Sequence, residues 1–214
     1  MKILVLVLTY LDNGIYSNLY HKQNETWNSI DVDGVDVYFN INDGEKKEIK
    51  GHFIINDLPE TVETEGYKII NCFEQTLNWD YDYIYHTNSS SYVDKKLLHE
   101  WLLDKPRENF YSGLIGDYSG YKFASGCGFT ISKDVVKKIL EHQNEWSHGD
   151  CDDATLGILL NSLNIPIYPA PRFDIIDKRI TEIPDNYFHY RCKTHDRDWD
   201  VQNFDKIFNL KKNK

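Results

Sequence analysis

Hydrophobic positions along the chain follow two alternating rhythms. Short runs rich in Val, Ile, Phe and Tyr are typical of buried strands, and we expect strands at residues 3–8, 35–41, 83–87, 110–115 and 122–131. Between them, apolar residues recur every three to four positions, which predicts helices at residues 16–30, 61–77, 93–103, 132–140 and 153–163. Three prolines force an extended path over residues 166–171. This alternation predicts an α/β sandwich around a mainly parallel sheet.

The first apolar run, MKILVLVL, has two alternative interpretations. As a signal segment or membrane span it is too short, and Thr9, Tyr10 and Asp12 follow it without a small-residue cleavage site. A strand in the interior of a parallel sheet is continuously apolar, as this run is. No other segment is long and apolar enough for a membrane span, so we expect a soluble protein.

Length and charge limit the remaining choices. A chain of 214 residues, 41% of them hydrophobic, is long enough for one core and short for two. We therefore expect a single domain over residues 1–214, with residues 201–214 as a basic tail whose Lys211, Lys212 and Lys214 form a solvated, frayed end. The net charge of −10 argues against a nucleic acid as partner, because binding phosphates requires clustered Lys and Arg.

Four cysteines stand far apart and show no paired spacing: Cys72, Cys127, Cys151 and Cys192. Such spacing favours free thiols over a disulfide framework or a zinc site. The sequence therefore predicts a reducing compartment and a cytoplasmic location.

Candidate chemistry is concentrated in two segments, ASGCGFTISKDVV (residues 124–136) and GDCDDATLG (residues 149–157). Gly126 and Gly128 flank Cys127 in a predicted strand, where glycine lowers stability unless a bulge or a ligand needs the missing Cβ. Asp150, Asp152 and Asp153 immediately precede a helix. The helix dipole favours acids there, so simple capping is one interpretation, and a sugar-transfer site beside the glycines is the other. Both remain open at this point.

The run SGCGFTIS…DDATLG…LNI resembles the fringe and β1,3-galactosyltransferase families of GT-A glycosyltransferases, and the resemblance extends thinly over residues 2–208. It implies a GT-A-like α/β/α sandwich around a mainly parallel, mixed sheet. By this resemblance Asp153 is the catalytic carboxylate and general base, and Asp152 orients the donor or acceptor. Gly126, Cys127 and Gly128 would lie against the sugar. Inversion at the anomeric carbon is implied in the same way.

Two loops are expected at the edge of the sheet where ligands bind, outside the carboxyl ends of the strands. Thr9, Tyr10 and Leu11 follow the first strand, and the resemblance implies that they hold uracil and ribose; an ordinary strand end is the alternative. The second group, His86 to Ser91, follows the strand YDYIY. There the family carries an acidic Asp-x-Asp type motif, whereas this chain has Asn88, Ser89, Ser90 and Ser91.

Neutral oxygens hold a hard cation more weakly than carboxylates do. Three alternatives follow: a metal held with fewer carboxylates, a metal-independent transferase that uses basic groups, or a protein that has lost catalysis. Asp80 and Asp82 also form an Asp-x-Asp, but strand alternation places both on one face before the strand, which favours surface solvation.

A basic cluster lies in FHYRCKTHDRDWD (residues 188–200), with Arg191, Lys193, His195 and Arg197. Arg forks match phosphate geometry, so this cluster is a natural partner for a diphosphate. The alternative is a solvated tail paired with neighbouring aspartates. The family resemblance also implies a metal-ligating histidine after an aromatic residue, and His189 after Phe188 fits that position.

These observations predict transfer of a sugar from a UDP-sugar to a hydroxyl of a glycan or glycoprotein, assisted by Mn²⁺ or Mg²⁺ together with His189, Arg191 and Lys193. Glycoside hydrolysis needs two carboxyls on opposite sides of the sugar, which the adjacent Asp152 and Asp153 do not supply. A non-catalytic glycan-binding module is a further alternative, supported by the 14% aromatic content. A chain of this kind fits a bacterium or a large DNA virus, such as a chlorella virus, that builds its own glycans in the cytoplasm.

Overall fold

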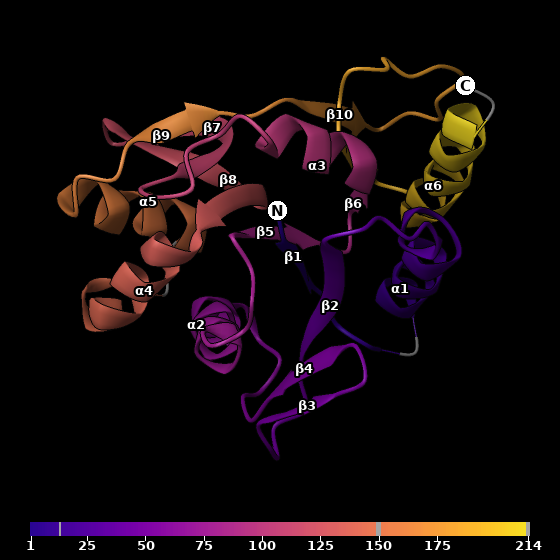
Figure 1. Cartoon of the computed structure of the whole chain (residues 1–214). Coiled ribbons are helices and arrows are strands. Elements are labelled where there is room, and N and C mark those ends of the chain that lie inside the picture. Colours follow the sequence, from indigo (N-terminus) through magenta and orange to yellow (C-terminus); the bar gives the residue numbers. More distant parts are fainter. Residues whose placement is uncertain (13, 149–150, 213–214) are drawn as a thin grey trace.

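The computed structural model describes residues 1–12, 14–148 and 151–212, and shows a mixed α/β domain built on a large sheet (Figure 1). The sheet has eight strands in the order β3-β4-β2-β1-β5-β8-β7-β9. They are β1 (Ile3–Leu8), β2 (Val35–Asn42), β3 (Glu48–Lys50), β4 (Phe53–Asn56), β5 (Tyr83–Asn88), β7 (Tyr111–Tyr118), β8 (Tyr121–Ser132) and β9 (Ile167–Pro169). The central strands β2, β1 and β5 are parallel, and β8 runs antiparallel to β5. The mixed, GT-A-like sandwich expected from the sequence is therefore confirmed.

A second, smaller sheet has the order β10-β11-β6, with β10 (Arg172–Ile176), β11 (His189–Lys193) and β6 (Ser91–Val93). Strand β6 follows β5 after a turn and leaves the large sheet to pair antiparallel with β11. Because of this pairing, a C-terminal strand lies directly beside the turn at the end of β5.

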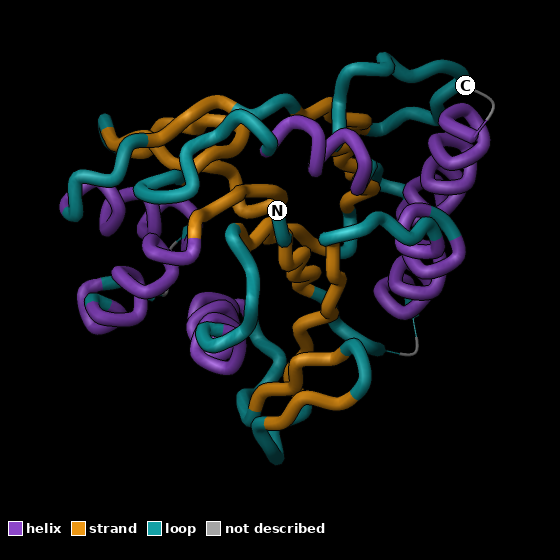
Figure 2. Tube along the Cα trace, viewed as in Figure 1, coloured by secondary structure: helices purple, strands orange, loops and turns teal. Residues whose placement is uncertain are grey.

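Two hydrophobic clusters cover the two faces of β1, as strand alternation requires. Ile3, Val5 and Val7 belong to one cluster, and Leu4 and Leu6 to the other. The helices divide accordingly, so that they flank the sheet on both sides (Figure 2). The first cluster is covered by α1 (Ile15–Glu25), α3 (Lys95–Leu102) and α6 (Arg197–Lys212), and the second by α2 (Glu65–Thr76), α4 (Lys133–Glu141) and α5 (Asp152–Ser162).

Helix starts differ in detail from the sequence expectation. The segment expected as one helix over 16–30 divides into α1 and a short 3-10 turn, η1 (Trp27–Ser29). Asp94 caps α3, because its carboxylate accepts a hydrogen bond of 3.0 Å from the Leu97 amide. Ser132 precedes α4 without capping it. Its hydroxyl instead accepts from the Phe110 amide at 3.0 Å and donates to Asp134.

The C-terminal segment is not the frayed tail that its charge suggests. Residues 197–212 form helix α6, on which Phe204 and Ile207 are fully buried. Lys211 forms an ion pair of 2.8 Å with Asp94 and lies 5.0 Å above the ring of Tyr190. The solvated reading is therefore wrong for Lys211, although Lys212 is exposed and Lys214 lies outside the described residues.

Across the described part of the chain, no helix combines the length and the apolar character that crossing a bilayer requires.

Candidate active site

A cleft lies at the carboxyl ends of β1 and β5, where Leu8 and Asn88 are register partners. It consists of two adjoining cavities of about 420 Å³ and about 340 Å³ that share Leu8, Val62, Glu65 and Asn88. The larger, here the β1 cavity, is further lined by Thr9, Tyr10, Tyr16, Glu60, Thr61, Ser89, Ser90, Lys193 and Arg197. The smaller, here the α5 cavity, is further lined by Ile69, His86, Gly126, Cys127, Phe129, Trp146, Cys151, Asp152, Asp153 and Leu156.

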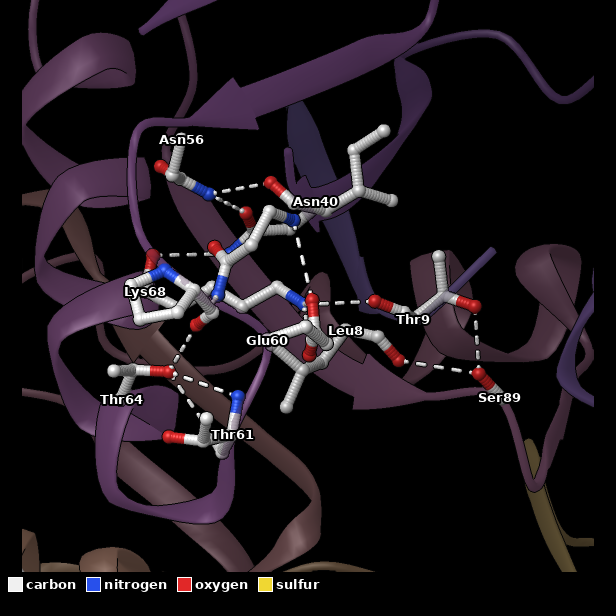
Figure 3. Close-up of polar contacts among 12 residues, drawn as sticks. Leu8, Thr9, Asn40, Asn56, Glu60, Thr61, Thr64, Lys68 and Ser89 are labelled. Carbon is white, nitrogen blue, oxygen red and sulfur yellow. Dashed lines mark hydrogen bonds and ion pairs between the residues drawn. The ribbon is translucent and has the colours of Figure 1, made fainter. Parts of the chain in front are cut away.

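The turn after β1 is fixed by a buried lysine (Figure 3). Lys68, 1% exposed at its side chain, donates to the Thr9 carbonyl at 2.7 Å and to both carboxylate oxygens of Glu60 at 2.9 and 2.7 Å. The Thr9 hydroxyl in turn lies 2.7 Å from the Ser89 hydroxyl. Thr9 and Tyr10 thus line the β1 cavity as the sequence suggests, whereas Leu11 lines neither cavity.

The loop Asn88–Ser91 has a rigid internal hydrogen-bond network. The Asn88 side-chain oxygen accepts from the Ser90 amide at 3.1 Å and from the Ser91 hydroxyl at 3.3 Å. From α1, the buried Gln23 amide donates to the carbonyls of Asn88 and Ser91 at 3.2 and 3.0 Å. The loop therefore presents neutral oxygens and amides to the β1 cavity in a preformed arrangement.

Only part of the C-terminal basic cluster reaches the cleft. Lys193 and Arg197 line the β1 cavity, and an Arg197 Nη donates to the Ser90 hydroxyl at 2.9 Å. Arg191, expected to bind the nucleotide, lines neither cavity and lies on β11 opposite Ser91. His195 is exposed and pairs with Asp177. Arg197 was noticed in the sequence only as a member of the cluster, and its role appears once β11 is paired with β6.

His189 is enclosed in the interior and does not line the cleft. Its exposed fraction is 2%, and its Nε2 lies 2.9 Å from the Ser91 hydroxyl. Burial, with Arg172 and Arg191 nearby, holds the pKa of His189 well below its usual range. The structure thus gives His189 a packing role, in contrast to the metal-ligating role that the sequence favours.

The two glycines of SGCG have different structural reasons. A Cβ on Gly128 would lie 2.4 Å from His189 Cε1 and 2.7 Å from the Tyr85 hydroxyl, so the packed core requires glycine there. A Cβ on Gly126 would lie 3.2 Å from the Asp153 Cβ. Gly126 and Cys127 line the α5 cavity and Gly128 does not, so the expected approach of Gly128 to a sugar is not seen.

Asp153 is held firmly at the wall of the α5 cavity. Its Oδ2 accepts from the Gly126 amide at 2.6 Å, and its Oδ1 accepts from the Ala154 amide at 2.9 Å and from the Cys151 thiol at 2.7 Å. The nearby Asp153 carboxylate raises the pKa of the Cys151 thiol to about 11, so Cys151 stays protonated and donates. These contacts go beyond the helix capping that the sequence left as an alternative.

Asp152 lies on the same cavity but faces α2. Its carboxylate is 3.1 Å from His148 Nδ1, and Trp146 donates to its backbone carbonyl at 3.2 Å. A Cβ on Gly66 would come within 2.2 Å of His148 and 2.7 Å of the Asp152 carboxylate, so this glycine lets α2 pack against the pair. Asp150, the third acid of the sequence motif, lies outside the described residues.

Several residues of the cleft give no sequence signal of their own. Val62, Glu65, Tyr16 and Trp146 line it through contacts between distant segments. His86, by contrast, belongs to the group expected at this edge from the sequence and lines the α5 cavity. It stacks on Phe129 with ring centroids 4.6 Å apart, and burial lowers the pKa of His86 to about 4.

Asp80 and Asp82 precede β5, at the end of the strand away from the cleft. Asp82 pairs with Arg107 at 2.6 Å, and Asp80 pairs with Lys2 and is 85% exposed at its side chain. This agrees with the surface role expected from strand alternation. Among residues 1–12, 14–148 and 151–212, no group of three or more His, Cys, Asp or Glu side chains is arranged to hold a metal ion.

An acid pair beside a glycine strand, at the carboxyl edge of a mixed sheet, is the arrangement that the resemblance to GT-A glycosyltransferases implies. The family model described as galactosyltransferase matches residues 36–171, more than half of the chain, and the chain therefore belongs to the galactosyltransferase family. The matched segment contains the loop Asn88–Ser91, Gly126 and Asp153, but not Lys193 or Arg197.

Among solved structures, the chain is similar to a glycosyltransferase involved in the glycosylation of the major capsid of PBCV-1. The TM-score is 0.60 at 15% sequence identity, over 96% of this chain and 99% of that one, so the likeness is one of fold. Comparison with curated protein sequences gave no match.

Proposed function

We propose that the protein transfers a sugar from a UDP-sugar to a hydroxyl of a glycan or glycoprotein, with Asp153 as general base. The observation that carries this proposal is the fixed Asp153 carboxylate at the wall of a cavity that opens into a second one. One cavity is suited to the sugar and acceptor, and the other to the nucleotide. Family membership supports the reaction class.

The hydrogen bonds of Asp153 fix its orientation and leave one acceptor position free. A carboxylate has about four lone-pair positions, and three accept from Gly126, Ala154 and Cys151. The remaining position can accept the proton of an acceptor hydroxyl, while the three bonds fix the carboxylate in one orientation. As the hydroxyl oxygen attacks the anomeric carbon, its proton passes to Asp153. The bond to the diphosphate breaks, and UDP leaves with the electron pair. Attack on the face opposite the leaving group inverts the anomeric centre.

Asp152 is proposed to orient the sugar rather than to take a proton. Its contact with His148 ties it to the loop before α5, close to the first turn of α2. Because Asp152 and Asp153 are adjacent, they do not flank a sugar from two sides, which argues against glycoside hydrolysis.

The β1 cavity is proposed to hold the uridine diphosphate. A volume of about 420 Å³ lies within the usual range for small-molecule sites. Thr9 and Tyr10 line it at the end of β1, and the Lys68 contact holds the Thr9 carbonyl in place. Asn88 lines both cavities and Ser89 and Ser90 line the β1 cavity, and the diphosphate would lie along this loop.

Assistance by Mn²⁺ or Mg²⁺ stays a prediction. The donor set in the cleft fits such an ion poorly, because the loop Asn88–Ser91 offers neutral oxygens, His189 is enclosed, and the Asp153 oxygens already accept three hydrogen bonds. Glu65 and Asp152 also line the cleft, but among the described residues they do not complete a group of three or more side chains arranged to hold a metal ion. No step of the proposed reaction is derived through a metal. The cytoplasmic location likewise stays a prediction from the spacing of the cysteines, whose four thiols are free in the structure.

A direct test combines nucleotide binding with turnover. UDP should raise the melting temperature of the protein, and incubation with a panel of UDP-sugars and glycan acceptors should release UDP only when donor and acceptor are both present. Binding of glycans without binding of any nucleotide would instead support the non-catalytic glycan-binding module. Release of UDP at equal rates with and without acceptor would argue for hydrolysis of the donor.

A further inference from the structure

We propose that Lys193 and Arg197 form a diphosphate-binding site that compensates the charge of the nucleotide in place of a metal held by carboxylates. This inference rests on the proposed function, because it concerns how the same cleft holds its donor. It differs from the sequence expectation in replacing Arg191 and His189, neither of which lines the cleft, by Arg197.

The two cationic residues lie on C-terminal elements and both line the β1 cavity. Lys193 is the last residue of β11, and Arg197 is the first of α6. Strand β11 is anchored beside the loop by the β6 pairing and by the Cys192 amide, which donates to the Ser90 carbonyl at 2.7 Å. The positions of both cations relative to Ser90 are therefore set by backbone hydrogen bonds.

The Arg197 guanidinium already contacts other groups of the protein. One nitrogen of the guanidinium bonds the Ser90 hydroxyl at 2.9 Å, and another pairs with the fully buried Asp200. The side chain is 20% exposed, so part of it remains open to the cavity. Asp200 and the Cys192 carbonyl hold one Nη in place, and the Nη that bonds Ser90 keeps a second N–H that can donate to a phosphate oxygen.

Lys193 supplies an uncommitted charge. Within the described residues its ammonium makes no hydrogen bond or ion pair, and the residue is exposed on the cavity wall. The carboxylate of Glu60, which also lines this cavity, is already paired with Lys68. Glu65 is the other carboxylate of the cavity, and desolvation raises its pKa. Lys193 follows Cys192, whose amide bonds the Ser90 carbonyl, so the exposed charge beside the neutral loop is positive, which suits an anion.

The chemistry of the loop leads to the same conclusion. Asn88, Ser89 and Ser90 carry hydroxyl and amide groups, which can donate hydrogen bonds to phosphate oxygens but bind a divalent cation weakly when no carboxylate accompanies them. During transfer, the diphosphate oxygen that leaves the anomeric carbon takes the electron pair of the broken bond. Lys193 and Arg197 would stabilise the negative charge that develops on it.

Calorimetry on the whole chain in the presence of EDTA tests the site, with uridine, UMP and UDP as probes. We expect UDP to bind more tightly than UMP, and UMP more tightly than uridine, without added metal. Lys193→Gln should weaken UDP binding by about tenfold, the scale of one hydrogen bond to a charged group, and leave uridine binding unchanged. Lys193→Arg should retain most of the affinity.

A matched control is Lys206→Gln, an exposed lysine on α6 that lines neither cavity, and UDP affinity should not change. Arg197 needs a different design, because its removal alone leaves the buried Asp200 unpaired. The double variant Arg197→Gln with Asp200→Asn removes both charges together. It should lose UDP affinity while keeping the wild-type melting temperature to within a few degrees.

Two outcomes would overturn the inference: UDP binding that disappears in EDTA and returns with Mn²⁺, or wild-type UDP affinity in Lys193→Gln. Either result leaves the proposed sugar transfer intact, since turnover is measured separately. Conversely, Lys193-dependent UDP binding in EDTA without any turnover would support this site and count against the proposed transferase activity.

Discussion

The two cavities of the cleft are built in different ways. The α5 cavity joins β8 to the start of α5 through the bond between Gly126 and Asp153, which lie 27 positions apart. The β1 cavity takes its wall from segments spread along the chain, at residues 8–10, 16, 60–65, 88–90 and 193–197. Under the proposed function, the chemistry would be encoded in a local motif, whereas donor binding would depend on the topology of the whole fold.

The largest expected effect is on the local motif. Asp153→Asn should keep UDP binding and reduce turnover by a factor of about 100 or more, the usual scale for a general base. Asp117→Asn, an exposed acid paired with Lys122, is the matched control and should be neutral. Steady-state kinetics with a UDP-sugar would check this. Near-normal turnover of Asp153→Asn would break the assignment of chemistry to the α5 cavity.

A second test separates the two glycines of β8. Gly128→Ala should lower the free energy of unfolding by about 3 kcal/mol, because its Cβ meets His189 and Tyr85 in a closed core. Gly126→Ala should cost only about 1 kcal/mol, but it should slow turnover by shifting Asp153. Urea unfolding measures the stability loss of each variant, and steady-state kinetics on the same samples measures its turnover. Equal stability losses would mean that both glycines serve packing alone.

In the β1 cavity, the turn after β1 should be sensitive to loss of the Lys68 contacts. Lys68→Met removes the donor to Thr9 and leaves Glu60 unpaired; because Glu60 is partly exposed, we expect a loss of only about 2 kcal/mol in unfolding free energy. UDP affinity should fall with it, while alkylation of Cys151 stays unchanged. Lys47→Met, which breaks the surface pair with Glu74, is the control. Unchanged UDP affinity in Lys68→Met would separate the turn from nucleotide binding.

The smallest expected effect concerns Cys151. The Asp153 carboxylate raises the pKa of this exposed thiol to about 11, so at pH 8 it should react with iodoacetamide at least about tenfold more slowly than an ordinary exposed thiol. The thiolate fraction, and hence the rate, should rise as the pH approaches 11. Asp153→Asn should restore the ordinary rate at pH 8. A wild-type rate that is already ordinary would mean that the Cys151–Asp153 hydrogen bond does not form in solution.

The strands of the large sheet were predictable where continuous apolar runs mark a buried strand, as in β1 and β5. Strand β3, with the sequence Glu-Ile-Lys, carries no such run and was missed, and β4 was missed although Phe53, Ile54 and Ile55 form a short apolar run. Helix α6 was missed for a reason related to that of β3. Its apolar residues are sparse among charges, and Phe204 and Ile207 are buried only because the rest of the fold covers them.

The residues expected at the site also divide into those that line the cleft and those that do not. Gly126, Cys127, Asp152 and Asp153 all line the cleft, because β8 and the start of α5, the second α-helix after it, bring two motifs into contact across 27 positions of the chain. His189, for which the family resemblance implies a metal-ligating role, points away from the cleft. Alternation along β11 places His189 on the side of Gly128 and Tyr85, and an adjacent aromatic residue in the sequence cannot indicate which side that is.

The pairing of β6 with β11 also orders the assembly of the molecule in time. The hydrogen bond between Ser91 and His189 joins residues 98 positions apart, and that between Ser90 and Arg197 joins residues 107 apart. Closing a loop of this length carries a larger entropy cost than joining β8 to α5, and contacts of high sequence separation slow folding. During synthesis, the wall that carries Asp153 can therefore form while the segment that completes the nucleotide cavity is still absent from the nascent chain.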